Sequence, residues 1–124
     1  MITEDYVSFE TAKLLKEKGF NISLDSKDWV CCMYDENGNI HWGVYDKNWY
    51  FRITLQMAMR WLREEKGLFI EISVSVDLNG NYHYSYSILD KECKYIRKGY
   101  TSFEWNYEEA VEAALLYVLQ KNLI

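Results

Sequence analysis

The sequence predicts an α+β fold, and three observations support this prediction. Two stretches of mainly apolar residues are each interrupted by an Asn-Gly pair, which is typical of a β-hairpin. Three other stretches carry helix-capping signals around apolar residues. A chain of 124 residues is expected to form a single compact domain, residues 1–124. We therefore predict a helix and a β-hairpin in about residues 1–53. An α-β-β-β-α unit should follow in about residues 54–124, with an antiparallel three-stranded sheet packed on the helices.

The first predicted helix begins after Ser8, whose side chain can accept a hydrogen bond from an amide of the first turn. Gly19 fits the left-handed position just beyond a helix end. Phe20 follows it, where a Schellman motif places an apolar residue. These signals place the helix between Ser8 and Gly19.

The first hairpin is predicted around Asn37-Gly38, the pair that best accepts two positive φ angles. A two-residue loop would place Trp29, Cys31 and Met33 on one face of the hairpin. The residues of the second strand on that same face would be Ile40, Trp42 and Val44.

The central helix is predicted from Thr54, a suitable N-cap, to Gly67, a suitable end. Its apolar residues at i, i+3, i+4 and i+7 are Leu55, Ala58, Met59 and Leu62. Met57 and Trp61 widen this arc to about half of the circumference, which predicts more cover than an ordinary surface helix receives.

A long hairpin is predicted after this helix because apolar residues alternate on both sides of Asn79-Gly80. The two apolar rows are Ile70, Ile72, Val74, Val76 and Leu78 before the turn, and Tyr82, Tyr84, Tyr86 and Ile88 after it. Since a one-residue slip inverts every side chain, the rows share a face only if the loop is odd. We therefore expect a loop of residues 79–81 with a positive φ near its end. The expected pairs are Val76 with Tyr84 and Val74 with Tyr86.

A third strand is expected within residues 94–105, and a last helix from Asn106. Asn106 and Glu109 match a capping box, in which each side chain accepts from the other residue's backbone amide. One stripe of this helix should pack on the sheet; it consists of Tyr107, Ala110, Val111, Ala114 and Val118.

The opposite side of the last helix starts with Glu108, Glu109 and Glu112 and continues with Leu116 and Leu119. We expect the acidic start to be solvated and the two leucines to be covered. The covering element would be the first helix, through Ala12 and Leu15, or the first hairpin, or the same surface of a second copy. If nothing in the chain covers them, Leu116 and Leu119 are candidates for a partner interface.

Composition limits the function classes. The net charge is −5, and acidic residues outnumber basic ones in both halves, which argues against a nucleic-acid-binding domain. The N-terminus is polar and acidic, unlike a signal peptide, and no apolar run reaches membrane-spanning length. Three cysteines, two of them adjacent, make a poor disulfide framework. We therefore expect a cytoplasmic protein, without membrane contact, whose thiols are free and mostly buried.

The order of elements from Thr54 to Asn122 is similar to the topology of the double-stranded-RNA-binding domain. In that family the final helix begins with basic residues that hold phosphates. Here the matching stretch carries Glu108, Glu109 and Glu112, which would repel phosphate. The resemblance therefore implies a topology and no RNA-binding residue.

A second resemblance covers most of the chain. The segments "EDYVSFETAKLLKEKGF", "ITLQMAMRWLREEKG" and "YEEAVEAALLYVL" resemble a group of small uncharacterised proteins encoded in phage and prophage genomes. This resemblance implies a phage or mobile-element origin, and hence a host-cell cytoplasm. It implies no activity and no functional residue.

Candidate catalytic and metal-binding residues are few. Cys31 and Cys32 with His41 could suggest a metal site, but adjacent cysteines of a strand point to opposite faces. Cys93 and His83 could act as nucleophile and base, but no third, orienting group can be assigned. No phosphate-binding loop or catalytic triad pattern is present in the sequence. We expect no catalytic residue, no metal and no cofactor.

Basic residues cluster at one place, where Lys91, Lys94, Arg97 and Lys98 are interleaved with tyrosines. Such a cluster can bind single-stranded nucleic acid by stacking, although a charged outer hairpin over packed tyrosines has the same pattern. The leading interpretation is a non-enzymatic protein-interaction module, because tyrosine and tryptophan anchor interfaces. A nucleic-acid-binding module using this cluster is the alternative, and an enzyme with an unrecognised site is the second alternative.

Overall fold

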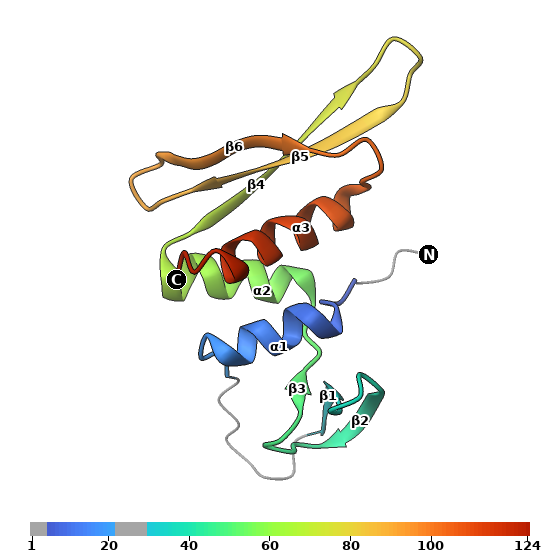
Figure 1. The fold of residues 1–124 in the computed structure, drawn as a ribbon, viewed down its shortest axis with the longest axis vertical. Coiled ribbons are helices and arrows are strands. Elements are labelled where there is room, and N and C mark those ends of the chain that lie inside the picture. Colours follow the sequence, from blue (N-terminus) through green and yellow to red (C-terminus); the bar gives the residue numbers. More distant parts are fainter. Residues whose placement is uncertain (1–4, 22–29) are drawn as a thin grey trace.

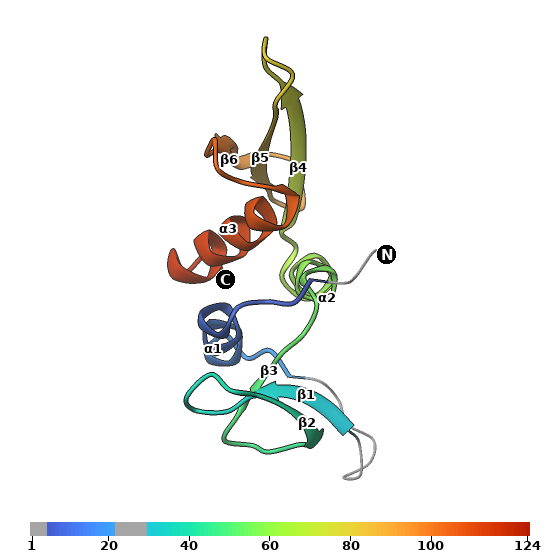
Figure 2. The ribbon, with the colours of Figure 1, turned by 90° about the vertical axis from the view of Figure 1, so that its right-hand side faces the viewer.

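The computed structural model describes residues 5–21 and 30–124 and confirms the α+β class. The elements are α1 (Phe9–Glu17), β1 (Val30–Tyr34), β2 (Ile40–Val44), β3 (Tyr50–Phe51), α2 (Leu55–Trp61), η1 (Leu62–Lys66), β4 (Phe69–Val76), β5 (Tyr82–Leu89), β6 (Tyr95–Thr101) and α3 (Tyr107–Gln120). The helices form a central layer with one antiparallel sheet at each end (Figures 1 and 2). Their strand orders are β2-β1-β3 and β4-β5-β6. The short β3, which was not predicted, completes the first sheet.

The predicted boundaries of α1 are confirmed. The Ser8 hydroxyl accepts a hydrogen bond from the Thr11 amide at 3.2 Å. At the other end the Gly19 amide donates to the Lys16 carbonyl, and the Phe20 amide donates to the Leu15 carbonyl. Gly19 has φ +88°, so this is the Schellman ending that the sequence predicts.

The central helix also begins and ends as predicted, with Thr54 accepting from the Met57 amide and Gly67 at φ +67°. Its apolar arc is narrower than predicted. Met57 is about half exposed, with 47% of its surface open. Trp61 is partly buried, and its ring meets Phe20 edge-on at 5.4 Å. Only the stripe through Leu55, Ala58 and Leu62 is fully covered by the rest of the chain.

Three hairpin turns share one geometry, which decides the register of both sheets. The turns are residues 35–39, 77–81 and 90–94, which begin at Asp35, Asp77 and Asp90. In each, the aspartate amide donates to the fifth residue's carbonyl, and the carboxylate accepts from the third and fifth amides. The fourth residue has a positive φ; these residues are Gly38, Gly80 and Cys93. The aspartate side chain therefore stabilises a three-residue loop in all three hairpins.

The predicted two-residue loop of the first hairpin is therefore wrong. Tyr34 pairs with Ile40 and Cys32 with Trp42, so the second-strand row lies on the face of Cys32 and Tyr34. Trp29, which was predicted on the face of Cys31, lies outside the described residues.

In the long hairpin the odd loop and the shared face are confirmed, with the positive φ at Gly80. The pairs are Val76 with Tyr82 and Val74 with Tyr84, two residues away from the prediction. Asp77 closes the turn, so the loop is residues 78–80 instead of residues 79–81.

The core lies where α3 packs against the second sheet on one side and against α1 on the other. The predicted α3 stripe is buried except for Tyr107, which stands at its edge with 39% exposed. Leu119 is only 1% exposed and belongs to the same cluster as Ala12 and Leu15. The predicted cover by the first helix is thus confirmed for Leu119, whereas Leu116 stays partly exposed.

The acidic start of α3 is not solvated throughout, which corrects the prediction for Glu112. Its carboxylate accepts from the Ser8 amide at 3.2 Å and from the hydroxyls of Ser8 and the buried Thr11. Glu112 thereby sits at the N-terminus of α1, where the helix dipole favours a negative charge. Glu109 completes the predicted capping box with Asn106.

Candidate interaction surface

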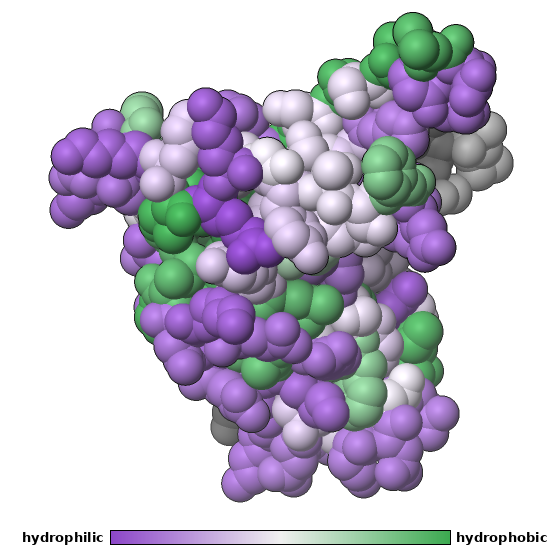
Figure 3. Space-filling view, turned by 45° about the horizontal axis from the view of Figure 1, so that its top comes forward, coloured by the Kyte–Doolittle hydropathy of each residue, from purple (hydrophilic) through white to green (hydrophobic). Residues whose placement is uncertain are grey.

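The distal part of the β4–β5 hairpin, residues 74–84, extends beyond the helices and is called the arm below (Figure 1). Its apolar row is open to solvent; the exposed fractions are 58% for Val74, 60% for Val76, 107% for Leu78 and 68% for Tyr82. Nearer the helices, Tyr86 and Ile88 of the same row are buried. Hydrophobic side chains accordingly gather at the protruding end of the molecule (Figure 3). The apolar face of the sheet that packs on the helices near Tyr86 and Ile88 therefore continues along the arm, where no helix of the described residues covers it.

The outer edge of β4 has no neighbouring strand among the described residues, since the sheet order is β4-β5-β6. The Asp77 amide donates to the Asn81 carbonyl, so Asp77 and Asn81 form a hydrogen-bonded pair of the antiparallel ladder. Because such pairs alternate along an antiparallel ladder, Ser75 and Ser73 also bond inward to β5. The backbone groups left pointing outward belong to Ile70, Ile72, Val74 and Val76.

The two edges of this sheet differ in their protection against further pairing. On β6 the register shifts twice against β5, Gly99 takes a positive φ, and Lys98 adds an exposed charge. Bulges and lysines of this kind hinder the addition of another strand. The β4 strand contains neither a bulge nor a lysine, and its single charge is Glu71. The open edge of β4 is thus the one suited to bind an extended chain.

A second apolar row lies at the other end of the molecule, on β2. Ile40, Trp42 and Val44 are each more than half exposed. They lie on the face that carries the buried Tyr34 and Cys32. This row has three exposed members, against the four of the arm.

The predicted basic cluster is divided between several environments. The Arg97 guanidinium lies 4.0 Å from the ring centre of Tyr100 and 4.1 Å from that of Tyr117, on the side facing α3. Lys98 lies over Tyr95 at 4.8 Å, on the exposed part of the strand. Lys91 and Lys94 are exposed in the β5–β6 turn. Arg97 is therefore engaged within the fold, and the three lysines are the basic side chains left on the surface of this hairpin.

The cysteines and histidines lie in separate environments. Cys32 is buried and accepts from the Arg52 guanidinium at 3.6 Å, and Cys31 points to the opposite face. Burial and the neighbouring Cys32 raise the pKa of the Cys31 thiol. In residues 5–21 and 30–124, no group of three or more His, Cys, Asp or Glu is arranged to hold a metal ion.

Cys93 and His83 lie at opposite ends of β5. His83 bonds to Asp77 at 2.8 Å beside one turn, and Cys93 occupies the other turn. The seven residues from His83 to Leu89 alone span about 20 Å at strand spacing, which is too far for a nucleophile and its base. Cys93 is also exposed, which corrects the prediction of mostly buried thiols.

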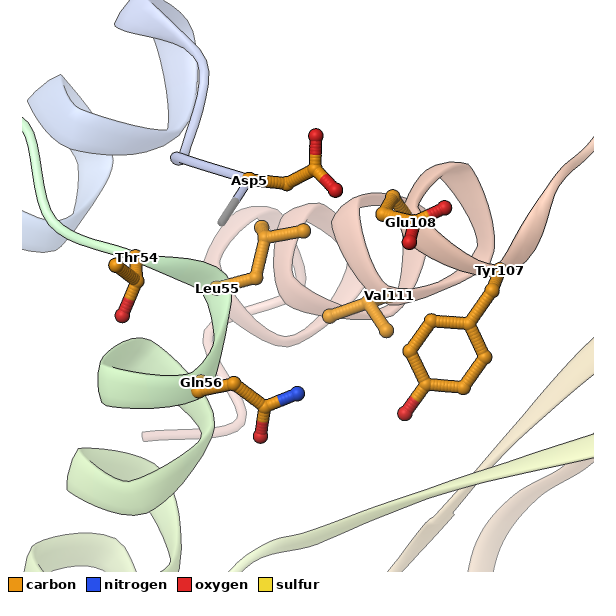
Figure 4. Close-up of a pocket in the computed structure, with 7 residues that line it drawn as sticks. All are labelled: Asp5, Thr54, Leu55, Gln56, Tyr107, Glu108 and Val111. Carbon is orange, nitrogen blue, oxygen red and sulfur yellow. The ribbon is translucent and has the colours of Figure 1, made fainter. Parts of the chain in front are cut away.

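The hollow drawn in Figure 4 lies between the starts of α2 and α3, beside Asp5. Its volume is about 190 Å³, below the roughly 300–1,000 Å³ of small-molecule sites. Leu55 and Val111 supply its apolar lining, and carboxylates of Asp5 and Glu108 stand at its rim. Its lining is completed by Thr54, Gln56 and Tyr107.

The chain matches no family model, no curated protein and no solved structure. No helix of residues 5–21 and 30–124 combines the length and the apolar character needed to cross a membrane. On the surface of the chain, the arm and the open β4 edge are adjacent.

Proposed function

We propose that the chain is a non-enzymatic protein-interaction domain that binds its partner through the arm and the open edge of β4. One observation carries the proposal: the exposed apolar row of the arm lies directly beside an unpaired strand edge. A partner strand on this edge would gain backbone hydrogen bonds, and its side chains would cover Val74 and Val76.

The energetics favour strand addition over simple apolar contact. Fully burying a valine contributes about 1.5–3 kcal/mol, and these valines have only a little over half of their surface left to bury. The cost of association is about 4–15 kcal/mol. The apolar row alone therefore gives little net affinity, and the backbone bonds of β4 supply part of the remainder.

A protein fits this surface better than a nucleic acid does. The arm and β4 carry no lysine or arginine, and the chain has a net charge of −5. The nucleic-acid alternative would depend on Lys91, Lys94 and Lys98, because Arg97 is held between tyrosines. On the resemblance to phage-encoded proteins, we place the partner among proteins of the host-cell cytoplasm, with the chain itself as one possible partner.

A photoreactive amino acid at position 78 tests the proposal. Leu78 is fully exposed in the β4–β5 turn, and Glu92, exposed in the β5–β6 turn, is the matched control position. After irradiation of expressing cells, position 78 should give a protein adduct heavier than the chain, and position 92 should not. Equal adducts from both positions, or none from position 78, would overturn the proposal.

A further inference from the structure

We propose that the β4 edge pairs with the β4 edge of a second copy, antiparallel and about a two-fold axis at Ser73. This inference rests on the proposed function and names the partner, with a defined residue register. It follows from the direction of the backbone groups, from the side chains of β4, and from the contrast between the two sheet edges.

Hydrogen-bond direction limits the possible registers. The outward backbone groups belong to the even-numbered residues of β4, so these residues must face even-numbered residues of the second copy. A two-fold axis at Ser73 pairs Ile70 with Val76 of the second copy and Ile72 with Val74. All four even-numbered residues of each strand are then used. Two-fold axes at Ile72 or Val74 would leave at least one of them unpaired.

The same register is chemically self-complementary. Every β-branched apolar residue of the row faces another one, and Ser73 faces Ser73 at the axis. Glu71 faces Ser75, so no charge meets a like charge directly. The two Glu71 side chains are about 14 Å apart, four residues along the ladder, which exceeds the screening length of about 8 Å at physiological salt.

In this register the exposed part of each arm lies beside β4 of the second copy. Val74 and Val76, both more than half exposed, would lie beside Ile72 and Ile70 of the second copy, which are the partly buried residues near the helices. The two sheets thus join edge to edge, and each copy lies beside the exposed half of the other copy's arm. An unrelated strand would have to supply the same alternation of apolar and small polar residues that β4 already has.

The contact area sets the strength of this pairing. Eight strand residues span about 27 Å, and a sheet layer is about 10 Å thick, so the edge alone buries about 270 Å² per copy. A stable interface buries about 800 Å² per copy. The pair therefore belongs to the weak, concentration-dependent class, with dissociation in the micromolar-to-millimolar range.

Disulfide trapping tests the register in the full chain. Ser73 bonds inward to β5, so across the axis the two Ser73 residues form a non-hydrogen-bonded pair with Cα atoms about 4.5 Å apart. This separation suits a disulfide, whereas two residues at position 75 would be about 14 Å apart. In a Cys93→Ser background, Ser73→Cys and Ser75→Cys are compared during oxidation by added diamide.

We expect Ser73→Cys to give at least tenfold more covalent dimer than Ser75→Cys. Equal yields, or a higher yield from Ser75→Cys, overturn the register. As a second readout that needs no cysteine, sedimentation of the wild-type chain should show an average mass that rises with concentration. Val74→Lys should abolish the rise, and Ile96→Lys on β6 should not.

The failure of this inference can be told apart from the failure of the proposed function. A monomer at all concentrations, together with a position-78 adduct to another protein, overturns self-pairing and leaves the proposed function in place. A monomer without any adduct at position 78 overturns both.

Discussion

Removal of the Glu112 carboxylate should destabilise the fold. This carboxylate accepts from the Ser8 amide and from the hydroxyls of Ser8 and Thr11, so it satisfies the first turn of α1 from another helix. Glu112→Ala leaves the buried Thr11 hydroxyl with one partner fewer. It also removes a negative charge from the positive end of the α1 dipole.

The expected cost can be derived from these contacts. The Ser8 amide loses its acceptor, a loss comparable to that of an N-cap interaction at about 0.5–2 kcal/mol, and loss of a favourable charge at a helix start costs about 0.3–1 kcal/mol. Together they give about 1–3 kcal/mol. For a chain of 124 residues, 1 kcal/mol corresponds to about 4 °C in the melting temperature, so Glu112→Ala should lower it by about 4–12 °C.

The assay is thermal and urea unfolding followed by circular dichroism. Glu112→Gln should fall between wild type and Glu112→Ala, because the amide oxygen still accepts one bond but the charge is gone. The matched control is Gln120→Ala, which removes the exposed link between Gln120 and Glu10 on the same two helices and should cost less than about 0.5 kcal/mol. If Glu112→Ala unfolds at the wild-type midpoint, or Gln120→Ala costs as much, the assigned role of Glu112 is refuted.

Three further predictions concern stability. Leu119→Ala should cost about 2–5 kcal/mol in urea unfolding because its side chain is buried, whereas the partly exposed Leu116→Ala should cost clearly less; equal costs would contradict the cover by α1. The His41 hydrogen bond, with backbone amides of the turn, lowers the pKa of Asp35 to about 2. Because the pKa of Asp35 is lower in the folded state, its carboxylate stabilises the fold fully above the unfolded-state pKa of about 4. This stabilisation is lost as the pH falls from about 4 to about 2. Asp35→Asn should therefore reduce the fall of the melting temperature between these two pH values. Cys93→Gly should stabilise the chain by about 1 kcal/mol because Cys93 adopts φ +62°, and an unchanged or lower midpoint would show that this backbone is not strained.

Much of the fold follows from local signals in the sequence. Ser8, Thr54 and Asn106 each cap a helix through the expected amide, because an N-cap interaction involves only residues within one turn. Gly19 and Gly67 end helices at positive φ for the same local reason. The alternation of apolar residues in the long hairpin predicts which residues share a face, because its two apolar rows must lie on the same side of the sheet.

The turns were mispredicted because the Asn-Gly pair is only part of the signal. An aspartate stands two residues before Asn37 and two before Asn79, and its carboxylate binds two turn amides. This interaction favours a three-residue loop and shifts the first hairpin by one residue. The same aspartates bond to His41 and His83, which follow each turn at equal spacing. The shared pattern Asp-x-Asn-Gly-Asn-x-His is visible in the sequence and would have identified both loops.

The candidate surface was harder to predict, because the exposure of a strand residue depends on how far the covering helix extends along the strand. The α3 helix of 14 residues spans about 21 Å, whereas eight-residue strands and their turn reach further. The alternating apolar row of the hairpin therefore extends beyond the end of α3, and Val74, Val76 and Tyr82 are exposed to solvent. In the same way, Arg97 was grouped with neighbouring lysines in sequence, although the strand turns its side chain toward Tyr117. Sequence spacing shows which face a residue shares but not where the covering element stops.

Amide hydrogen exchange along β4, measured on the wild-type chain at low and high concentration, is the sharpest test of the paired edge. In the paired state the outward amides of Ile70, Ile72, Val74 and Val76 are hydrogen-bonded to the second copy. At high concentration these four amides should exchange at least several-fold more slowly than in dilute solution, while amides of β6 keep their rates. Slowed exchange confined to β6 or β2, or rates on β4 that do not change at any concentration, would overturn the self-pairing of this edge.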